Sequence, residues 1–570
     1  MAWYTEAVFY HIYPLGMTGA PKENLYGEPV HRLKTLLPWI SHIKKIGCNA
    51  VYIGPLFESV GHGYETTDYR KLDSRLGTNE DLTEFVDQCH EQGIRVILDG
   101  VFNHTGRDFF AFQDSKKNRE QSVYRDWYCN VNFDGNNEYN DGFSYDNWGG
   151  YNLLVKLNQQ NPGVREYLYD SVRMWVKEFH IDGLRLDAAD VLDFTFMHGL
   201  REVANEVKPE FWLMGEVIHG DYSRWVNEGT LHSVTNYQLH KALYSGHNDH
   251  NYYEIAHTVK RLYEMGGNRV DGLNLYNFVD NHDVERIYTK LTYKAQFFPV
   301  HVMLYTLPGI PSVYYGSEFG IEGKKEQFSD ASLRPELHLE DYAEAYEKNF
   351  CTKLISALGK IRQQTPALSY GDFKELLLSN RQYAFARTYE NVSVIVTVNN
   401  DEASCQFTVG AADGCYVGAL SGQRRTVTGG QMQVSLEANS GEIWIPEGQD
   451  ACCDYEMEAL VQPEKQIENQ EDSSEDVHNI QDEAIRQSNN QDAEQNDCKK
   501  EEVYEVEETT TNAEIVLDLN KPYEEMSIEE LQASVLAKLA ANGPVTEQMR
   551  HDVEVNVYRD SLLNWVKSFR

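Results

Sequence analysis

Apolar residues recur with two different periods along the first 320 residues. Short runs rich in β-branched and aromatic residues are separated by longer segments in which apolar residues return every three or four positions. The first pattern is typical of strands and the second of amphipathic helices. The predicted strands are 7–13, 50–56, 95–101, 183–188, 211–217, 233–238, 273–280 and 311–315, and the predicted helices are 32–46, 80–92, 163–179, 196–207, 252–265, 295–306 and 343–363.

This alternation of strands and helices predicts a parallel sheet, and eight strands predict a closed (β/α)8 barrel. The barrel would comprise residues 1–104 and 158–370. The connection between them, 105–157, is too long for an ordinary strand–helix loop, so it predicts an inserted domain after the third strand. This segment leaves the carboxyl end of a barrel strand, which is where barrel enzymes carry their active sites.

The pattern changes after residue 370. Residues 371–446 contain short alternating runs and predict an antiparallel β-sandwich. Residues 447–512 are acidic, rich in Gln, Asn and Ser and poor in apolar residues, so they predict a disordered linker. Helical periodicity returns in 513–570, with a capping box at 527–530 and a break at Gly543-Pro544, and predicts a helical hairpin. Such a hairpin buries little by itself: it either packs on its own barrel, binds a protein partner or self-associates.

Composition restricts the partners and the compartment. The net charge is −38, about half of it from 447–510, which argues against a nucleic-acid partner. No apolar run approaches the ~20 residues of a membrane span, and the first residues lack the pattern of a signal peptide. The nine cysteines are scattered without a C-x-x-C pair, which indicates free thiols and a cytoplasmic location.

Charged residues follow several predicted strands. The third strand continues into 99–104, the fifth carries Glu216, and the seventh runs into 280–283. On the fourth strand, Arg185 and Asp187 share a face, and the guanidinium favours the ionised form of the carboxylate. Taken alone, this pair could also be a structural ion pair. In a barrel, however, all these strand ends meet at one mouth.

Two carboxylates in different environments suit the hydrolysis of glycosides. Asp187 would be the ionised nucleophile. Glu216 would donate a proton to the leaving oxygen and then act as a base, with a pKa raised by the neighbouring carboxylates. Asp283 would stabilise the developing charge, and His104 and His282 would donate to sugar hydroxyls.

A metal site is the alternative reading, because Asp, His and Glu clusters also bind divalent cations. The sequence shows no H-x-H or HExxH spacing, and Arg185 within the cluster argues against a bound cation. The chemistry described above requires no cofactor.

The ordered motifs at 99–104, 183–187, 216 and 281–283 resemble those of the α-amylase family, glycoside hydrolase family 13. Supporting segments are 61–69, 153–158 and 310–318, so the resemblance covers roughly 1–446. Residues 155–158 resemble the cyclomaltodextrinase and neopullulanase branch. Those enzymes usually carry an additional N-terminal β-domain, whereas this chain begins directly at the first predicted strand.

The resemblance implies a role for each matching residue. Asp187 would form a covalent glucosyl intermediate, Glu216 would be the general acid/base, and Asp283 would stabilise the transition state. Asp99 would hold Arg185 in place. The substrate-binding residues that the resemblance implies are Tyr64, which would stack on a sugar, His104, Arg185, which would orient Asp187, His282 and Arg334. For Arg334 a surface salt bridge is the alternative.

Trp148, in the inserted domain, either stacks on another glucose ring or belongs to the core of that domain. The family's calcium site draws on the residue equivalent to Asn103, which makes Asn103 a weak candidate ligand. The loop 16–20 lacks the aspartates that bind calcium in some subfamilies, so structural calcium has no support in this sequence. Ala188 follows the nucleophile, where members that cleave α-1,6 bonds often have Val, and this favours α-1,4 bonds. Ala189-Asp190 stands where many amylases have Lys-His.

The sequence therefore predicts a cytoplasmic retaining hydrolase that cleaves α-1,4-glucosidic bonds of maltodextrins and starch-derived oligosaccharides. Transglycosylation (an α-glucanotransferase) and α-1,6-glucosidase activity at the same site are alternatives, because they pass through the same kind of intermediate. A third reading is an inactive relative that serves as a sugar-binding or scaffold protein. Such a relative should have lost an essential carboxylate or Arg185, and all of them are present.

Overall fold

The computed structural model describes residues 2–267, 273–326, 329–447 and 528–542. It divides into two units, 1–476 and 477–570. In the second unit the described element is α16 (Ile528–Asn542), which corresponds to the first helix of the predicted hairpin and ends directly before Gly543-Pro544. Residues 448–512 of the predicted linker and the second helix of the predicted hairpin lie outside the described residues.

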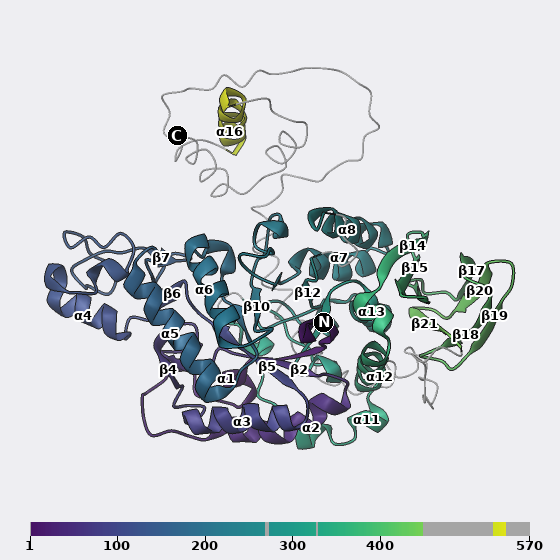
Figure 1. The fold of residues 1–570 in the computed structure, drawn as a ribbon, viewed down its shortest axis with the longest axis horizontal. Coiled ribbons are helices and arrows are strands. Elements are labelled where there is room, and N and C mark those ends of the chain that lie inside the picture. Colours follow the sequence, from purple (N-terminus) through teal and green to yellow (C-terminus); the bar gives the residue numbers. More distant parts are fainter. Residues whose placement is uncertain (1, 268–272, 327–328, 448–527, 543–570) are drawn as a thin grey trace, which may run out of the picture. The chain divides into compact units, whose positions relative to one another are not determined.

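The first unit is built around a parallel barrel (Figure 1). Its eight strands follow the order β11-β10-β9-β5-β2-β1-β13-β12, and a parallel bridge between Thr235 and Tyr276 joins the two ends. The predicted (β/α)8 barrel is thus confirmed. The strands are β1 (Phe9–Ile12), β2 (Ala50–Ile53), β5 (Arg95–Gly100), β9 (Gly183–Leu186), β10 (Trp212–Gly215), β11 (Ser233–Val234), β12 (Tyr276–Asn277) and β13 (Ile310–Tyr314).

Alternation along these strands fills the interior of the barrel with apolar side chains. On β10, for example, Trp212 and Met214 point inward and belong to a buried cluster with residues from five other strands. The next inward position on β10 is Glu216, and on β5 Asp99 follows Ile97 in the same way. An apolar floor therefore supports a polar layer at the carboxyl ends of the strands.

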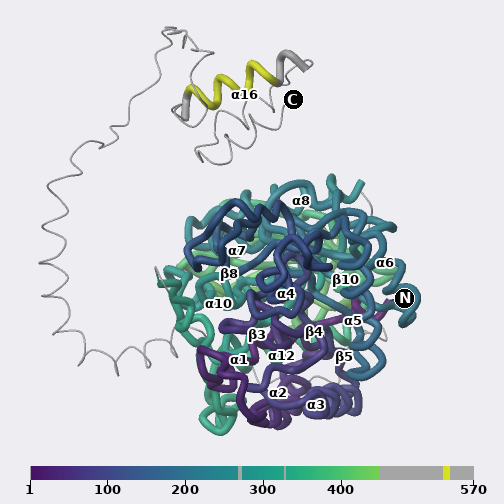
Figure 2. The backbone as a smooth tube through the Cα atoms, turned by 90° about the vertical axis from the view of Figure 1, so that its left-hand side faces the viewer, coloured from purple at the N-terminus to yellow at the C-terminus, as the bar shows by residue number. Residues whose placement is uncertain are grey.

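Amphipathic helices cover the outside of the barrel (Figures 1 and 2). The sequence determines their ends locally: a capping box of Thr78 and Asp81 starts one helix, and Asn161 caps another. The helices are α1 (Pro14–Met17), α2 (Leu37–Lys45), α3 (Asn79–Glu91), α5 (Pro162–Phe179), α6 (Phe194–Val207), α7 (Tyr237–Asn248), α8 (Tyr252–Met265), α9 (Ile287–Lys290), α10 (Phe297–Thr306), α11 (Ala345–Lys348), α12 (Phe350–Gln364) and α13 (Pro366–Tyr370).

Helix α7 was not predicted. The run 233–238 reads as one strand, but the strand β11 covers only Ser233 and Val234. Asn236 then accepts a hydrogen bond from the backbone N–H of Leu239 and caps α7. A short side chain that competes for backbone donors ended the strand earlier than its apolar pattern suggested.

The insertion after β5 forms a small sheet of its own, at the left of Figure 1. Its strands are β6 (His104–Thr105), β7 (Asn147–Trp148) and β8 (Tyr151–Lys156), with β8 in the centre, and α4 (Phe110–Asn118) accompanies them. Gly149 and Gly150 connect β7 to β8 and both have positive φ angles, 63° and 84°. Two such residues form the tight hairpin turn that matches the twist of a sheet. A further hairpin, β3 (Phe57–Ser59) and β4 (Thr66–Leu72), follows β2.

The residues after α13 form two antiparallel sheets, at the right of Figure 1. The larger has the order β14-β15-β16-β21-β18-β19 and the smaller pairs β17 with β20. Side chains from both sheets, including Ile395, Val434 and Trp444, share one buried cluster, so the predicted β-sandwich is confirmed. The strands are β14 (Asp372–Leu378), β15 (Gln382–Tyr389), β16 (Val392–Asn399), β17 (Cys405–Gly410), β18 (Gly414–Gly418), β19 (Arg424–Val427), β20 (Gln431–Leu436) and β21 (Ser440–Pro446).

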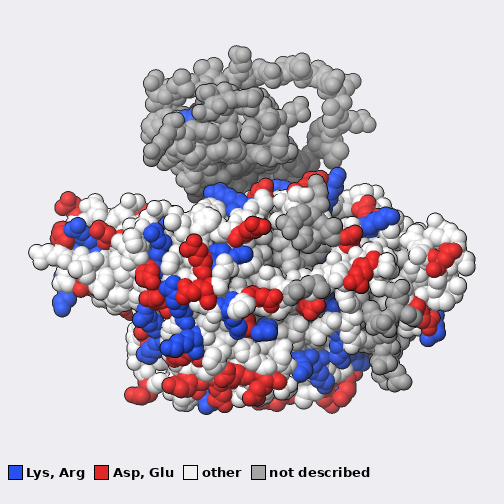
Figure 3. Space-filling view, in the orientation of Figure 1, with Lys and Arg blue, Asp and Glu red and all other residues white. Residues whose placement is uncertain are grey.

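The described surface carries both signs of charge. Figure 3 shows acidic side chains gathered along the lower edge, where α3 lies, and side chains of both signs over the rest of the visible face. Within the described residues, no helix has the length and apolar character needed to cross a membrane.

Candidate active site

Arg185 is the centre of the polar layer. Its side chain is 3% exposed. Asp99 lies beside it in the register between β5 and β9, and Nη1 of Arg185 donates to both Asp99 Oδ1 and Asp187 Oδ1 at 2.9 Å. The other terminal nitrogen, Nη2, pairs with Glu216 Oε2 at 2.9 Å. A single buried guanidinium therefore holds three carboxylates that come from three adjacent strands.

The backbone after Asp187 brings β9 against Glu216. Ala188 has a left-handed conformation, with φ 45°, and its N–H donates to Glu216 Oε2 at 3.1 Å. The N–H of Ala189 donates to the backbone carbonyl of Glu216 at 2.9 Å. A β-branched residue would be strained at this φ, so the small side chain of Ala188 suits the turn.

The ionisation of Asp187 depends on its burial and on its charged neighbours. Burial raises the pKa of Asp187 well above its usual value; Arg185 opposes this rise, and the charge of Glu216 adds to it. Arg185 thus acts in the predicted direction, but burial outweighs it. Burial and the neighbouring charge of Glu216 therefore favour the protonated form of Asp187 in the free enzyme.

Asp283 occupies a different environment, after β12. Its side chain is 34% exposed, against 13% for Asp187 and for Glu216. His282 Nε2 lies 3.0 Å from Oδ2, and Arg334 Nη2 donates to Oδ1 at 2.9 Å. Although burial opposes them, His282, Arg334 and Arg185 hold the pKa of Asp283 well below its usual range. Asp283 is therefore an ionised acceptor that faces solvent.

Tyr64, His104 and His282 form one connected group beside Asp99. The hydroxyl of Tyr64 lies 2.6 Å from His282 Nε2 and donates to Asp99 Oδ2 at 3.1 Å. The rings of Tyr64 and His282 are stacked, with centroids 5.7 Å apart, so the stacking on a sugar that was predicted for Tyr64 would use its other face. His104 Nε2 lies 3.1 Å from the carbonyl of Tyr64, and burial lowers the pKa of His104 to about 4. His104 is consequently neutral near neutral pH.

The structure thus brings the predicted Asp187, Glu216, Asp283, Arg185, His104, His282 and Tyr64 together at the carboxyl ends of the strands. Arg334 joins them, because it contacts Asp283 and is 13% exposed, which disfavours the surface salt bridge considered above. Asn103, the candidate calcium ligand, lies in the same layer, and its Nδ2 is 3.3 Å from His104 Nδ1. Among the described residues, no group of three or more His, Cys, Asp or Glu side chains could hold a metal ion.

Several residues of the site could not be predicted from the charged motifs. Tyr237, the first residue of the unpredicted α7, donates to Glu216 Oε1 at 3.3 Å and accepts from Asn281 Nδ2 at 3.2 Å. Tyr52 donates to Asp99 at 2.9 Å, and the ring of His11 stacks on Tyr52 with centroids 4.2 Å apart. For Tyr52 and His11 the signal was present, since both are polar residues on inward positions of predicted strands.

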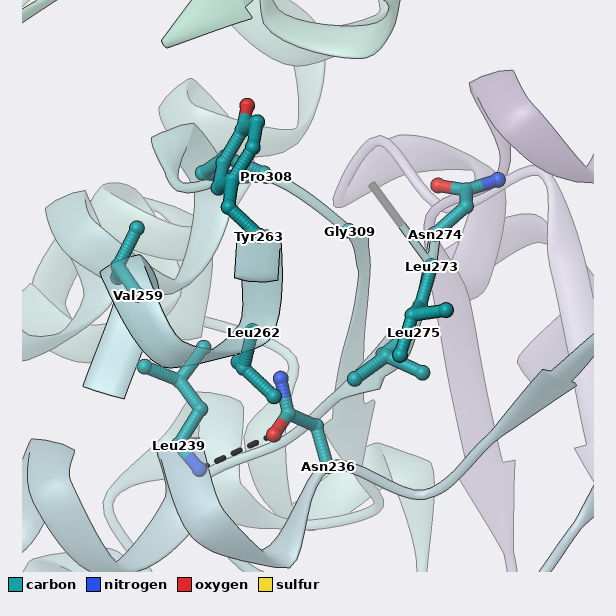
Figure 4. A pocket seen from close by; sticks show the side chains of 10 residues that line it. All are labelled: Asn236, Leu239, Val259, Leu262, Tyr263, Leu273, Asn274, Leu275, Pro308 and Gly309. Atoms are coloured by element: carbon teal, nitrogen blue, oxygen red, sulfur yellow. Dashed lines mark hydrogen bonds between the residues drawn. The ribbon is translucent and has the colours of Figure 1, made fainter. Parts of the chain in front are cut away.

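A separate pocket lies at the opposite end of the barrel (Figure 4). Leu275 and Gly309, which line it, immediately precede β12 and β13, whereas the carboxylates lie after the strands. Its lining is mainly apolar and its volume is about 30 Å³. This is the space of a water molecule rather than of a glucose ring, so the pocket does not compete with the polar layer as a substrate site.

A barrel with an insertion after its third strand, a C-terminal β-sandwich and carboxylates at the mouth defines a class of protein. Residues 32–366 match the family model described as "Alpha amylase, catalytic domain". The chain therefore belongs to the alpha-amylase family and is a glycoside hydrolase.

The relatives point within this family to a particular group. The chain is 33% identical over 419 residues to a cyclomaltodextrinase of Thermoanaerobacter pseudethanolicus, covering 70% of this chain and 71% of the relative. It is 31% identical over 452 residues to a cyclomaltodextrinase of a Bacillus species, covering 74% and 77%. A solved cyclomaltodextrinase structure superposes with a TM-score of 0.70 at 27% identity, covering 78% of each chain.

Proposed function

We propose that this protein is a retaining hydrolase that cleaves α-1,4-glucosidic bonds of maltodextrins and starch-derived oligosaccharides. The observation that carries the proposal is the pair Asp187 and Glu216 on the two terminal nitrogens of Arg185. Two carboxyl groups held close to one another are the arrangement that retaining glycosidases use. The substrate class is supported by the names of the relatives, which are cyclomaltodextrinases.

In the proposed mechanism a carboxylate oxygen of Asp187 attacks the anomeric carbon. Glu216 gives its proton to the departing glycosidic oxygen as that bond breaks. Glu216 then removes a proton from water, whose oxygen displaces Asp187 and releases the sugar with its original configuration. The first step requires an ionised Asp187 and a proton on Glu216, so binding of the substrate would move the proton that burial favours on Asp187 to Glu216.

The remaining residues provide charge and orientation. Asp283, kept ionised by His282 and Arg334, would accept hydroxyl hydrogen bonds that strengthen as the oxocarbenium ion develops. Neutral His104 has one ring N–H, and its Nε2 faces the Tyr64 carbonyl, so donation to a sugar hydroxyl would replace this contact. We also propose a cytoplasmic location, which is supported by the free thiols of the six cysteines in the described residues.

Transglycosylation and cleavage of α-1,6 bonds remain the alternatives, because both use the same glucosyl intermediate. Analysis of the products distinguishes these two activities from the proposed hydrolysis of α-1,4 bonds. Maltotriose should give shorter sugars, whereas products longer than maltotriose would identify transfer. Isomaltose should resist cleavage, and rapid release of glucose from it would identify an α-1,6-glucosidase.

The variant Glu216→Gln tests the proposal. Its amide oxygen can still accept from Ala188 N–H and its NH2 group can donate to the Tyr237 hydroxyl, but it cannot supply a proton, so kcat on maltotriose should fall by roughly 10²–10⁴-fold. Far-UV circular dichroism should remain unchanged. Glu340→Gln, at an exposed position, is the matched control and should keep full activity. Persistence of normal turnover in Glu216→Gln would overturn the assignment.

A further inference from the structure

We infer that Trp148 is the platform for a second glucose ring. This ring is attached to the non-reducing side of the reacting glucose, opposite the leaving group. Trp148 is 40% exposed, so it does not belong to the core of the inserted domain. Its ring centroid lies 6.0 Å from that of His104, with an angle of 38° between the planes. The indole therefore lies beside a residue of the proposed site and still presents surface to solvent.

The local fold holds this ring in place. Trp148 ends β7, the turn of Gly149 and Gly150 follows, and β8 returns through the centre of the small sheet. The other edge of that sheet is β6, where His104 pairs with Lys156 of β8. Trp148 and His104 thus belong to one hydrogen-bonded sheet, and strands position a side chain more precisely than a loop does.

The strand order determines which side of the site Trp148 occupies. In the barrel, β9 lies between β10 and β5. Asp187 follows β9, Glu216 follows β10, and His104 lies in the segment that follows β5, so Glu216 and His104 lie on opposite sides of Asp187. The next step rests on the proposed function: Glu216 protonates the leaving oxygen and marks the leaving-group side. Trp148, beside His104, therefore lies on the opposite side.

The chemistry of an indole fits a pyranose ring. One face of glucose presents C–H groups, which pack on an aromatic surface, while the hydroxyls at the ring edge remain hydrated. No charged partner is required. The occupant is accordingly an α-linked glucose unit attached to the non-reducing side of the reacting glucose, and the enzyme should prefer substrates that place at least two glucose units on that side.

Two chromogenic substrates test this assignment. Release of 4-nitrophenol from 4-nitrophenyl α-glucoside requires one glucose on the non-reducing side, whereas release from 4-nitrophenyl α-maltoside requires two. Trp148→Ala should lower kcat/KM on the maltoside by about tenfold, the effect of losing one aromatic contact of about 1.4 kcal/mol. On the glucoside the change should stay within about twofold, because sites that do not share a partner act independently.

Trp148→Phe keeps an aromatic face and should recover most of the activity on the maltoside. Tyr253→Ala removes a similarly exposed aromatic ring from α8 and should change neither substrate. Equal losses on both substrates, or no loss on the maltoside, would overturn the assignment. If the wild-type protein released no 4-nitrophenol from either substrate, the proposed function itself would be wrong, and the two failures are thus distinguishable.

Discussion

Arg334 fixes the charge of a carboxylate that lies 51 positions away in the sequence. Because Arg334 lowers the pKa of Asp283, Arg334→Ala should raise that pKa toward its usual value. Asp283 would then take up a proton at a higher pH as the solution is acidified. The acid limb of the pH profile of kcat/KM, which reports the free enzyme, should move to higher pH.

Two variants separate this effect from a general loss of structure. Arg334→Lys retains a positive charge and should shift the acid limb less than Arg334→Ala. Arg424→Ala removes an exposed arginine from β19 and should leave the profile unchanged. An acid limb that stayed in place in Arg334→Ala, with only its height reduced, would show that Arg334 does not control the ionisation of Asp283.

Residue-scale prediction succeeded where two side chains share one strand. The alternation of side chains along β9 predicts that Arg185 and Asp187 lie on the same face, and the two are in contact. Alternation within one strand does not predict the position of Glu216, which lies 31 positions after Arg185 and contacts the same guanidinium. That contact depends on which strands are neighbours and on their register.

At the scale of elements, a buried carboxylate joins parts of the barrel that are far apart in sequence. Glu318, in the short helix Ser317–Phe319, is fully buried, and its Oε1 accepts from Tyr10 of β1 at 2.6 Å and lies 2.9 Å from His42 Nε2 of α2. Glu318→Ala leaves His42 buried without this partner and should cost about 3–5 kcal/mol of unfolding free energy.

Denaturant unfolding of the wild type, Glu318→Ala and the exposed-site variant Glu340→Ala measures this cost. Glu340→Ala should unfold like the wild type. Since Glu318 does not contact the proposed site, kcat of the folded Glu318→Ala protein should change little. An unfolding midpoint equal to that of the wild type would contradict the role assigned to this buried pair.

The predicted elements were reliable where apolar periods were long and less so where polar residues intervened. Helix 163–179 was predicted almost to the residue, since α5 runs from 162 to 179 between an Asn cap and a left-handed His180. The predicted strand 273–280, in contrast, contains only the two residues of β12. Directly after that run, Asn281 accepts from the N–H of Asp283, and local bonds of this kind compete with strand pairing.

At the scale of the whole molecule, the count of strands predicted the barrel because a closed parallel sheet is the arrangement that buries so many apolar strands under helices. The pairing that closes it, between Thr235 and Tyr276, could not be predicted. It depends on the combined twist and stagger of all eight strands, and the sequence of a single strand does not determine these.

The remaining question at this scale is the role of the C-terminal residues. We propose that 513–570 bind a protein partner or self-associate.

Removal of 450–570 should leave kcat/KM on maltotriose within about twofold, because the proposed site residues lie between His11 and Arg334 and the β-sandwich ends at Pro446. If the C-terminal residues self-associate, the full chain should sediment as a larger species than the truncated chain at equal concentration. If both chains sediment as monomers, self-association is wrong, and binding of a different protein is the remaining proposal for 513–570. Loss of activity in a truncated chain with an unchanged circular dichroism spectrum would show instead that these residues belong to the catalytic unit, since activity would then need contacts that the barrel and β-sandwich do not supply.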